Sequence, residues 1–232
     1  MTMSYFDKLK RRLKAFSVLD QLERQDRAKF EEIFNRSIED MCILFGMAPS
    51  GVLSAHIPSY PKPNYLKDSL GIDAFGMSFD VEVEQYPIFW NRLKQGREEV
   101  KPWHFQREVA GAKLHTLINP RSVRCGRDIR LVTNDLDVIH LAASKDFMPP
   151  PPWLVWYEAG PSLGMFNQAE PEYWYMTTWQ PFWSSLTVEE QTAYLREKRK
   201  LTRPYMSEDD WQSWVTLVRL ADERTSQTGW ED

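Results

Sequence analysis

The sequence predicts an α+β fold in which a mostly antiparallel central sheet carries N-terminal and C-terminal helices packed on one face. Apolar residues recur every three or four positions before residue 46 and again after residue 185, which is typical of amphipathic helices. Residues 77–85 instead alternate strictly between apolar and polar side chains, as a half-buried strand does. Further short segments rich in β-branched and aromatic residues are expected to extend the sheet.

We interpret the 232 residues as a single domain, 1–232. Its helical N-terminal part spans 4–46, a mixed sheet region spans 72–184, and a helical C-terminal part spans 185–224. Apolar residues make up 42% of the chain and charged residues 27%, which are ordinary values for a globular protein with a sizeable core.

Two amphipathic helices are expected between Tyr5 and Gly46. Ser17 and Asp20 have the spacing of a cap that restarts a helix, so a bend between the two helices is expected there. Residues 48–76 contain four prolines and three glycines, and this density of breakers predicts a long loop or a meander of short pieces.

The alternating segment is the clearest strand of the chain. Its apolar face is formed by Met77, Phe79, Val81 and Val83, and its polar face by Ser78, Asp80, Glu82 and Glu84. Pro87 suits the first turn of a short helix that ends before Gly96. Additional strands are expected over Lys113–Ile118, Asp128–Thr133, Asp137–Ala143, Trp153–Glu158 and Tyr173–Trp179.

Capping signals predict where the C-terminal helices begin. Thr187 with Glu190, and Ser207 with Asp210, have the spacing of capping boxes. An apolar stripe at helical spacing follows the second box and is formed by Trp211, Trp214, Val215 and Val218.

Catalytic motifs are weak in this chain. Residues 160–164 match the G-x-S-x-G nucleophile pattern, but all four histidines precede Ser162, so a turn is predicted there instead. No C-x-x-C or H-E-x-x-H spacing indicates a metal site, and no cofactor is expected. A Cys–His site assembled only by the fold would draw on His115, His140 and Cys125.

A metal-dependent nuclease is a further alternative. Asp73 or Asp80, followed by Glu99 and Lys101, is similar in outline to the D…E-x-K pattern of restriction-like endonucleases, in which carboxylates hold a metal. Pro102 directly after Lys101 argues against the central strand that this pattern requires.

The acidic face of the clearest strand is the main candidate for binding. Asp80, Glu82 and Glu84 repeat about 6.5 to 7 Å apart along a strand, so this face must meet solvent, a cation or basic side chains. A basic run follows later in the chain, at Arg121, Arg124, Arg127 and Arg130. Because Asp128 lies inside that run, internal ion pairs are expected, with an anion site as the alternative.

Aromatic residues cluster after residue 152. They are expected to pack beneath the C-terminal helices, to anchor a protein interface, or to stack on a sugar or base. The residues expected to bind a partner are Asp80, Glu82, Glu84, Trp153, Trp156, Tyr157 and Trp174.

These features predict a non-enzymatic protein-binding domain. One instance is an acidic inhibitor that masks a basic toxin in the manner of bacterial immunity proteins. The chain has no apolar run of signal-peptide or membrane-spanning length, which predicts a cytoplasmic protein without a membrane partner. A net charge of −4 argues against nucleic acid as the partner, while self-association stays open. The alternative is a hydrolase or metal-dependent nuclease whose site forms only on folding.

Overall fold

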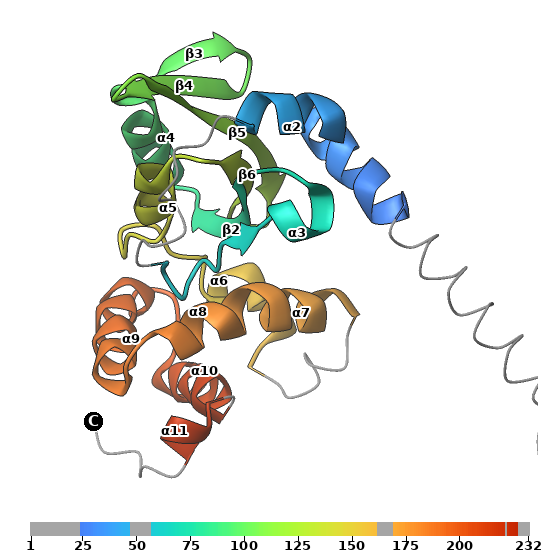
Figure 1. Ribbon diagram of the computed structural model, residues 1–232. Helices are drawn as coiled ribbons and strands as arrows, with labels where there is room; N and C mark the ends of the chain where they lie inside the picture. The colour runs from blue at the N-terminus through green and yellow to red at the C-terminus, as the bar shows by residue number, and fades with distance from the viewer. Residues whose placement is uncertain (1–23, 47–56, 162–168, 221, 227–232) are drawn as a thin grey trace, which may run out of the picture.

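The computed structural model describes residues 24–46, 57–161, 169–220 and 222–226 (Figure 1). Residues 24–34 are helical. The strands are β1 (Asn64–Tyr65), β2 (Phe75–Glu82), β3 (Glu98–Lys101), β4 (His104–Val109), β5 (Ala112–Val123) and β6 (Gly126–Thr133). The helices of the first two thirds are α2 (Ile38–Phe45), α3 (Lys67–Leu70), α4 (Tyr86–Lys94) and α5 (Leu136–Ala142). Those that follow are α6 (Pro152–Val155), η2 (Tyr157–Ala159), α7 (Ala169–Trp174), η4 (Tyr175–Trp179), α8 (Gln180–Ser185), α9 (Val188–Thr202), α10 (Glu208–Leu220) and α11 (Glu223–Ser226).

The six strands form one sheet in the order β1-β2-β6-β5-β4-β3, and every neighbouring pair is antiparallel. The predicted α+β class is therefore confirmed. Among the described residues, no helix has both the length and the apolar character that crossing a bilayer requires.

The predicted alternation in β2 is confirmed. Met77, Phe79 and Val81 are buried on one face of the sheet. The strand ends at Glu82, so Val83 falls in the following turn and is 53% exposed. The alternation in the sequence therefore continues through Val83 and Glu84, two residues beyond the end of the strand.

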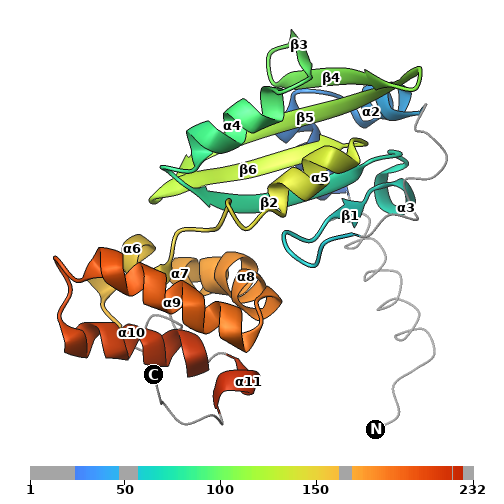
Figure 2. The same ribbon diagram turned by 90° about the vertical axis from the view of Figure 1, so that its left-hand side faces the viewer.

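Helices cover both faces of the sheet rather than one. Helices α4 and α5 lie in front of the sheet in Figure 2 and α2 lies behind it. Phe89 of α4 and Val138 of α5 share a core with Phe79. Met41 of α2 packs instead with Leu117 and Val132, whose side chains lie on the opposite face. The predicted single helical layer is thus wrong, because segment 137–143 supplies a second layer instead of a strand.

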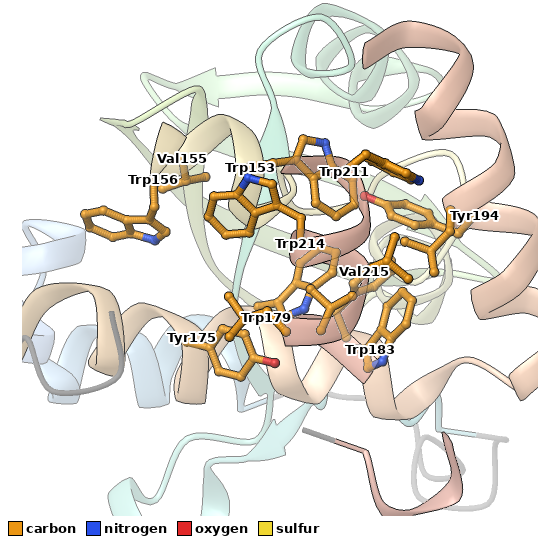
Figure 3. Packing of buried hydrophobic residues seen from close by; sticks show 14 of the residues in the cluster. Trp153, Val155, Trp156, Tyr175, Trp179, Trp183, Tyr194, Trp211, Trp214 and Val215 are labelled. Atoms are coloured by element: carbon orange, nitrogen blue, oxygen red, sulfur yellow. The ribbon is translucent and has the colours of Figure 1, made fainter. Parts of the chain in front are cut away.

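A separate aromatic core holds the C-terminal helices together, below the sheet in Figure 1. Figure 3 shows Trp153, Trp179 and Trp214 within it, each no more than 1% exposed. The ring of Trp153 meets that of Trp211 edge-on, with centroids 5.0 Å apart. The expectation that the C-terminal helices cover most of the aromatic cluster is confirmed.

Three predicted strands are helical. Residues 137–142 lie in α5, because the Asp135 side chain caps the helix by accepting a hydrogen bond from the Asp137 backbone N–H. Residues 153–155 lie in α6, which begins at Pro152 because the fixed φ of proline suits a first helical turn, and residues 157 and 158 lie in η2. Residues 173–179 form the end of α7 and the π-helix η4. Their buried positions recur at helical spacing in Tyr175, Trp179, Phe182 and Trp183.

Strands β3 and β4 were not predicted from the sequence. Ala110 and Gly111 adopt positive φ angles of 51° and 80° between β4 and β5, which is the geometry of a tight hairpin. Both predicted capping residues of the C-terminal helices are confirmed, since Thr187 and Ser207 each accept from a backbone N–H three residues on. The expected bend at Ser17 and the turn at Ser162 lie outside the described residues.

Candidate functional site

A cleft of about 390 Å³ lies where the C-terminal helices meet the end of the sheet. One wall comes from neighbouring strands β2 and β6, and the opposite wall comes from α6, α7 and η4. Its lining residues include Ser78, Asp80, Arg124, Asp128, Arg130, Trp156, Tyr173 and Trp174. Segments that are far apart in the chain therefore supply carboxylates, guanidiniums and aromatic rings to one space.

The strand register sets the polar wall. Asp80 of β2 is the direct cross-strand partner of Asp128 of β6, so both carboxylates lie on the same face of the sheet. Asp128 accepts hydrogen bonds from the Ser78 hydroxyl at 3.2 Å and from Arg130 Nε at 2.9 Å. The negative charge of Asp128 is therefore balanced by a guanidinium.

Asp80 has a different environment. It is 7% exposed, and its Oδ2 accepts a hydrogen bond from the Trp174 indole at 3.0 Å. No ion pair to Asp80 occurs among the described residues. Burial raises the pKa of Asp80 from 3.8 to about 6, and the nearby Asp128 charge adds to this, while the Trp174 hydrogen bond and Arg130 oppose it.

Aromatic side chains form the opposite wall. The rings of Trp156 and Trp174 meet edge-on with centroids 6.2 Å apart, and the Arg124 guanidinium lies 5.1 Å from the Trp156 ring centre. The Trp156 indole N–H is buried and has no hydrogen-bond partner among the described residues. Tyr173 is 71% exposed at the rim. The wall thus offers aromatic rings to a cation.

The π-helical turn η4 follows Trp174 directly and supplies Thr177 and Thr178 to the cleft. Such turns are rare and are often found at functional sites. Here the turn keeps Tyr175 and Trp179 in the aromatic core while Trp174 reaches Asp80.

The acidic residues do not form the open surface that their alternation predicts. Asp80 is buried in the cleft, and Glu82 pairs with Lys198 of α9. Glu84 lies in the turn after β2 and is exposed. The expectation of three acidic side chains facing outward together is therefore wrong, because the C-terminal helices cover the end of this strand face.

The aromatic candidates are also divided. Trp156 and Trp174 line the cleft, whereas Trp153 is 1% exposed inside the helical core. Tyr157 is 54% exposed beside the cleft region, where its ring meets that of Tyr205 at a centroid distance of 6.2 Å. The structure thus brings together Asp80, Trp156 and Trp174 out of the seven predicted positions.

The alternative Cys–His site does not assemble. His115 contacts His104, with ring nitrogens 3.1 Å apart in a buried pair whose desolvation lowers the pKa of His104 to about 4. Cys125 is exposed at the β5–β6 turn, where its Sγ donates to the Leu154 carbonyl at 3.4 Å. His140 lies on α5, on the other side of the sheet.

The nuclease pattern does not assemble either. Strand β2, with Asp80, and strand β3, with Glu99 and Lys101, are separated by three other strands. Asp73 instead pairs with Lys67 at 3.3 Å. Within the described part of the chain, no group of three or more His, Cys, Asp or Glu side chains is arranged to hold a metal.

The basic run forms one of the internal ion pairs that the sequence predicts. Arg130 pairs with Asp128, while Arg124 and Arg127 lie over the rings of Trp156 and Tyr86. Sequence reasoning did not place Arg130 near Asp80, because their proximity depends on the register between β2 and β6.

Comparison with known proteins provides no family for this chain: no protein-family model, curated protein or solved structure matches it.

Proposed function

We propose that this protein binds another, basic protein by receiving an arginine or lysine side chain in the cleft beside Asp80. The single observation that supports this is the Asp80 carboxylate, which is buried against Trp174 and has no ion pair among the described residues. A buried carboxylate is stabilised strongly by a cation that replaces its lost hydration. Because Asp80 lines the cleft, a cationic side chain that enters the cleft can approach this carboxylate.

One further feature favours a guanidinium over a simple metal cation. The cleft is lined by the rings of Trp156 and Trp174, and aromatic rings attract a guanidinium, as Arg124 over the Trp156 ring illustrates.

The charge of the whole chain supports the same partner class. A net charge of −4 favours the approach of a basic protein. Glu170 at the rim adds a carboxylate to the entrance, and the exposed rings of Tyr173 and Tyr157 offer apolar contact nearby. An inhibitor that masks a basic toxin is one function that such a surface would serve.

The test is calorimetric titration with acetyl-tetra-arginine amide, against the neutral tetra-citrulline peptide. Asp80→Asn keeps an oxygen that can accept from Trp174 but removes the charge, so arginine-peptide affinity should fall about tenfold or more. Glu84→Gln is the matched control, because Glu84 is an exposed acid just beyond the same strand and does not line the cleft. Equal binding of both peptides, or of wild type and Asp80→Asn, would refute the proposal.

A second candidate function is acid–base hydrolysis at the same cleft. Asp80 and Asp128 face each other across two strands with unequal environments, since burial raises the pKa of Asp80 while Asp128 is ion-paired. Two carboxylates in unequal environments are the arrangement that glycoside hydrolysis uses. Turnover of a panel of 4-methylumbelliferyl glycosides that is lost in Asp80→Asn would favour this function over binding.

A further inference from the structure

A basic groove of about 370 Å³ lies between α9 and α10. Figure 2 shows these two helices side by side. Residues 203–207 join them, a loop length typical of an antiparallel helix pair, so the last turns of α9 lie beside the first turn of α10. Among the described residues, none lines both this groove and the cleft beside Asp80. The volume is ordinary for a small-molecule site, for which about 300 to 1,000 Å³ is typical.

Positive charge dominates the lining of this groove. Among the described residues, five cationic side chains and one carboxylate line it: Arg196, Arg199, Lys200 and Arg203 from the α9 side, and Arg219 and Glu208 from α10. On the α9 side, each cation has another one three or four residues away, so these like charges are neighbours on the helix surface and repel one another. The whole chain has a net charge of −4, so the groove is a local positive site on an acidic protein. An anion held in the groove would relieve the repulsion.

The carboxylate of this lining is already engaged. Glu208 accepts a hydrogen bond from Arg199 Nη2 at 2.6 Å and another from Gln212 Nε2 at 3.0 Å. These hydrogen bonds, that of Gln212 first, lower the pKa of Glu208, and the charges of Arg199 and Arg203 act in the same direction. Glu208 therefore stays ionised at neutral pH and balances one of the five positive charges.

The arginines of the α9 side have different environments. The Arg199 guanidinium is held in place, since it lies 5.6 Å from the Trp211 ring centre and also donates to the Met206 carbonyl at 3.3 Å. Arg196 and Arg203 are exposed and make no ion pair within the described part of the chain. They are seven residues apart, so about two helical turns place both on the same face. Their guanidiniums are therefore available to an anion, on either side of Arg199.

The surplus charge matches two phosphate groups. With five cationic side chains and one carboxylate, the lining has a surplus of four positive charges. A phosphate group carries about −1.5 to −2 at neutral pH, so two such groups balance this surplus. Lys200 pairs with Glu197, but the two side chains are 61% and 67% exposed, and a pair so exposed contributes little that an anion would have to displace. The planar fork of a guanidinium also matches two oxygens of one phosphate.

We propose that this groove binds a small molecule that carries two linked phosphate groups, with Arg196 and Arg203 donating to the phosphate oxygens and Lys200 adding charge. The modest volume favours a small diphosphate over a long polyanion, which needs an extended basic surface. The site is separate from the proposed capture of a basic partner at Asp80, so either can fail without the other.

The experiment is calorimetric titration of the full chain with inorganic pyrophosphate at neutral pH and fixed ionic strength. Wild type is expected to bind one pyrophosphate per chain. Arg196→Gln and Arg203→Gln each remove one charged donor, so either should weaken binding about tenfold, and the double variant should abolish it. Arg121→Gln is the matched control, because it removes the same charge at an exposed position of β5 that does not line the groove. Asp80→Asn should also keep the wild-type affinity for pyrophosphate.

Stability provides a second measurement that separates binding from damage. Without ligand, Arg196→Gln and Arg203→Gln should unfold at the same urea concentration as wild type, because both side chains are exposed and unpaired among the described residues. Pyrophosphate should raise the urea midpoint of wild type but not that of the double variant.

Competing anions test the class of ligand. Citrate, a tricarboxylate of similar charge, should bind at least about tenfold more weakly than pyrophosphate, because its carboxylates do not offer the oxygen geometry of a phosphate. Absence of pyrophosphate binding, or equal binding by wild type and the double variant, would overturn the site. Citrate binding as tight as that of pyrophosphate would overturn the preference for phosphate. Tighter binding of a single-stranded thymidylate oligonucleotide than of pyrophosphate would overturn the small-molecule assignment in favour of nucleic acid.

Discussion

Replacing Asp80 by Asn is expected to stabilise the protein at neutral pH while weakening its proposed function. Burial raises the pKa of Asp80 from 3.8 to about 6 in the folded state. The folded protein therefore holds this proton more tightly than the unfolded chain does. The stability that comes from this tighter proton binding is fully present below pH 3.8, where Asp80 is protonated in both states. It is lost as the pH rises through about 6, where the buried carboxyl ionises.

The size of the effect follows from the shift. A change from 3.8 to about 6 corresponds to about 3 kcal/mol between the protonated and ionised limits. Asparagine has no proton to lose, and its side-chain oxygen can still accept from the Trp174 indole. At about pH 8, Asp80→Asn should therefore be more stable than wild type by about 2 to 3 kcal/mol, and the difference should shrink toward zero near about pH 4.

Urea unfolding followed by tryptophan fluorescence measures this difference across the pH range. Subtracting the two curves cancels every other titrating group that both proteins share. Glu84→Gln, an exposed acid at the end of the same strand, should show no such pH-dependent gain. A variant Asp80→Asn that is less stable than wild type at about pH 8, or a difference that does not change with pH, would refute the reasoning about desolvation.

Two further predictions follow from contacts around the sheet. Asp135→Ala should lose about 3 to 5 kcal/mol of unfolding free energy, because it removes the carboxylate that pairs with the buried Arg97. Asp137→Ala, at a position 66% exposed, should lose less than about 1 kcal/mol. Urea unfolding measures both losses. Trp174→Phe removes the indole donor, so the pKa of Asp80 should rise and the pH midpoint of arginine-peptide binding should move upward, which titrations at several pH values would detect. An unchanged midpoint would contradict the assigned role of Trp174.

Local patterns predicted several elements correctly. The alternation around Phe79 identified β2. Thr187 identified the start of α9, and Ser207, directly before Glu208, identified the start of α10. These features depend on neighbours two to four residues away, so they can be recognised from the chain alone.

The mistaken strands show where local propensity is overruled. Val138 and Ile139 favour strands by side-chain type, yet the Asp135 cap and burial against the sheet make them helical. In segment 173–179 the aromatic residues suggested a strand, although Tyr175 and Trp179 have helical spacing. That spacing was the signal that would have corrected the prediction, because periodicity reflects burial more directly than residue type does.

By itself, the sequence determined that the protein has an antiparallel sheet, a large aromatic core and a strand with carboxylates along one face. Only the tertiary structure decided what those carboxylates meet, since the Asp80–Trp174 contact joins residues 94 positions apart. The same packing turned an expected open acidic surface into a buried carboxylate in a cleft, with Glu82 paired to Lys198. The physical reason is that desolvation and ion pairing depend on which distant segments cover a side chain, and no local periodicity encodes that choice.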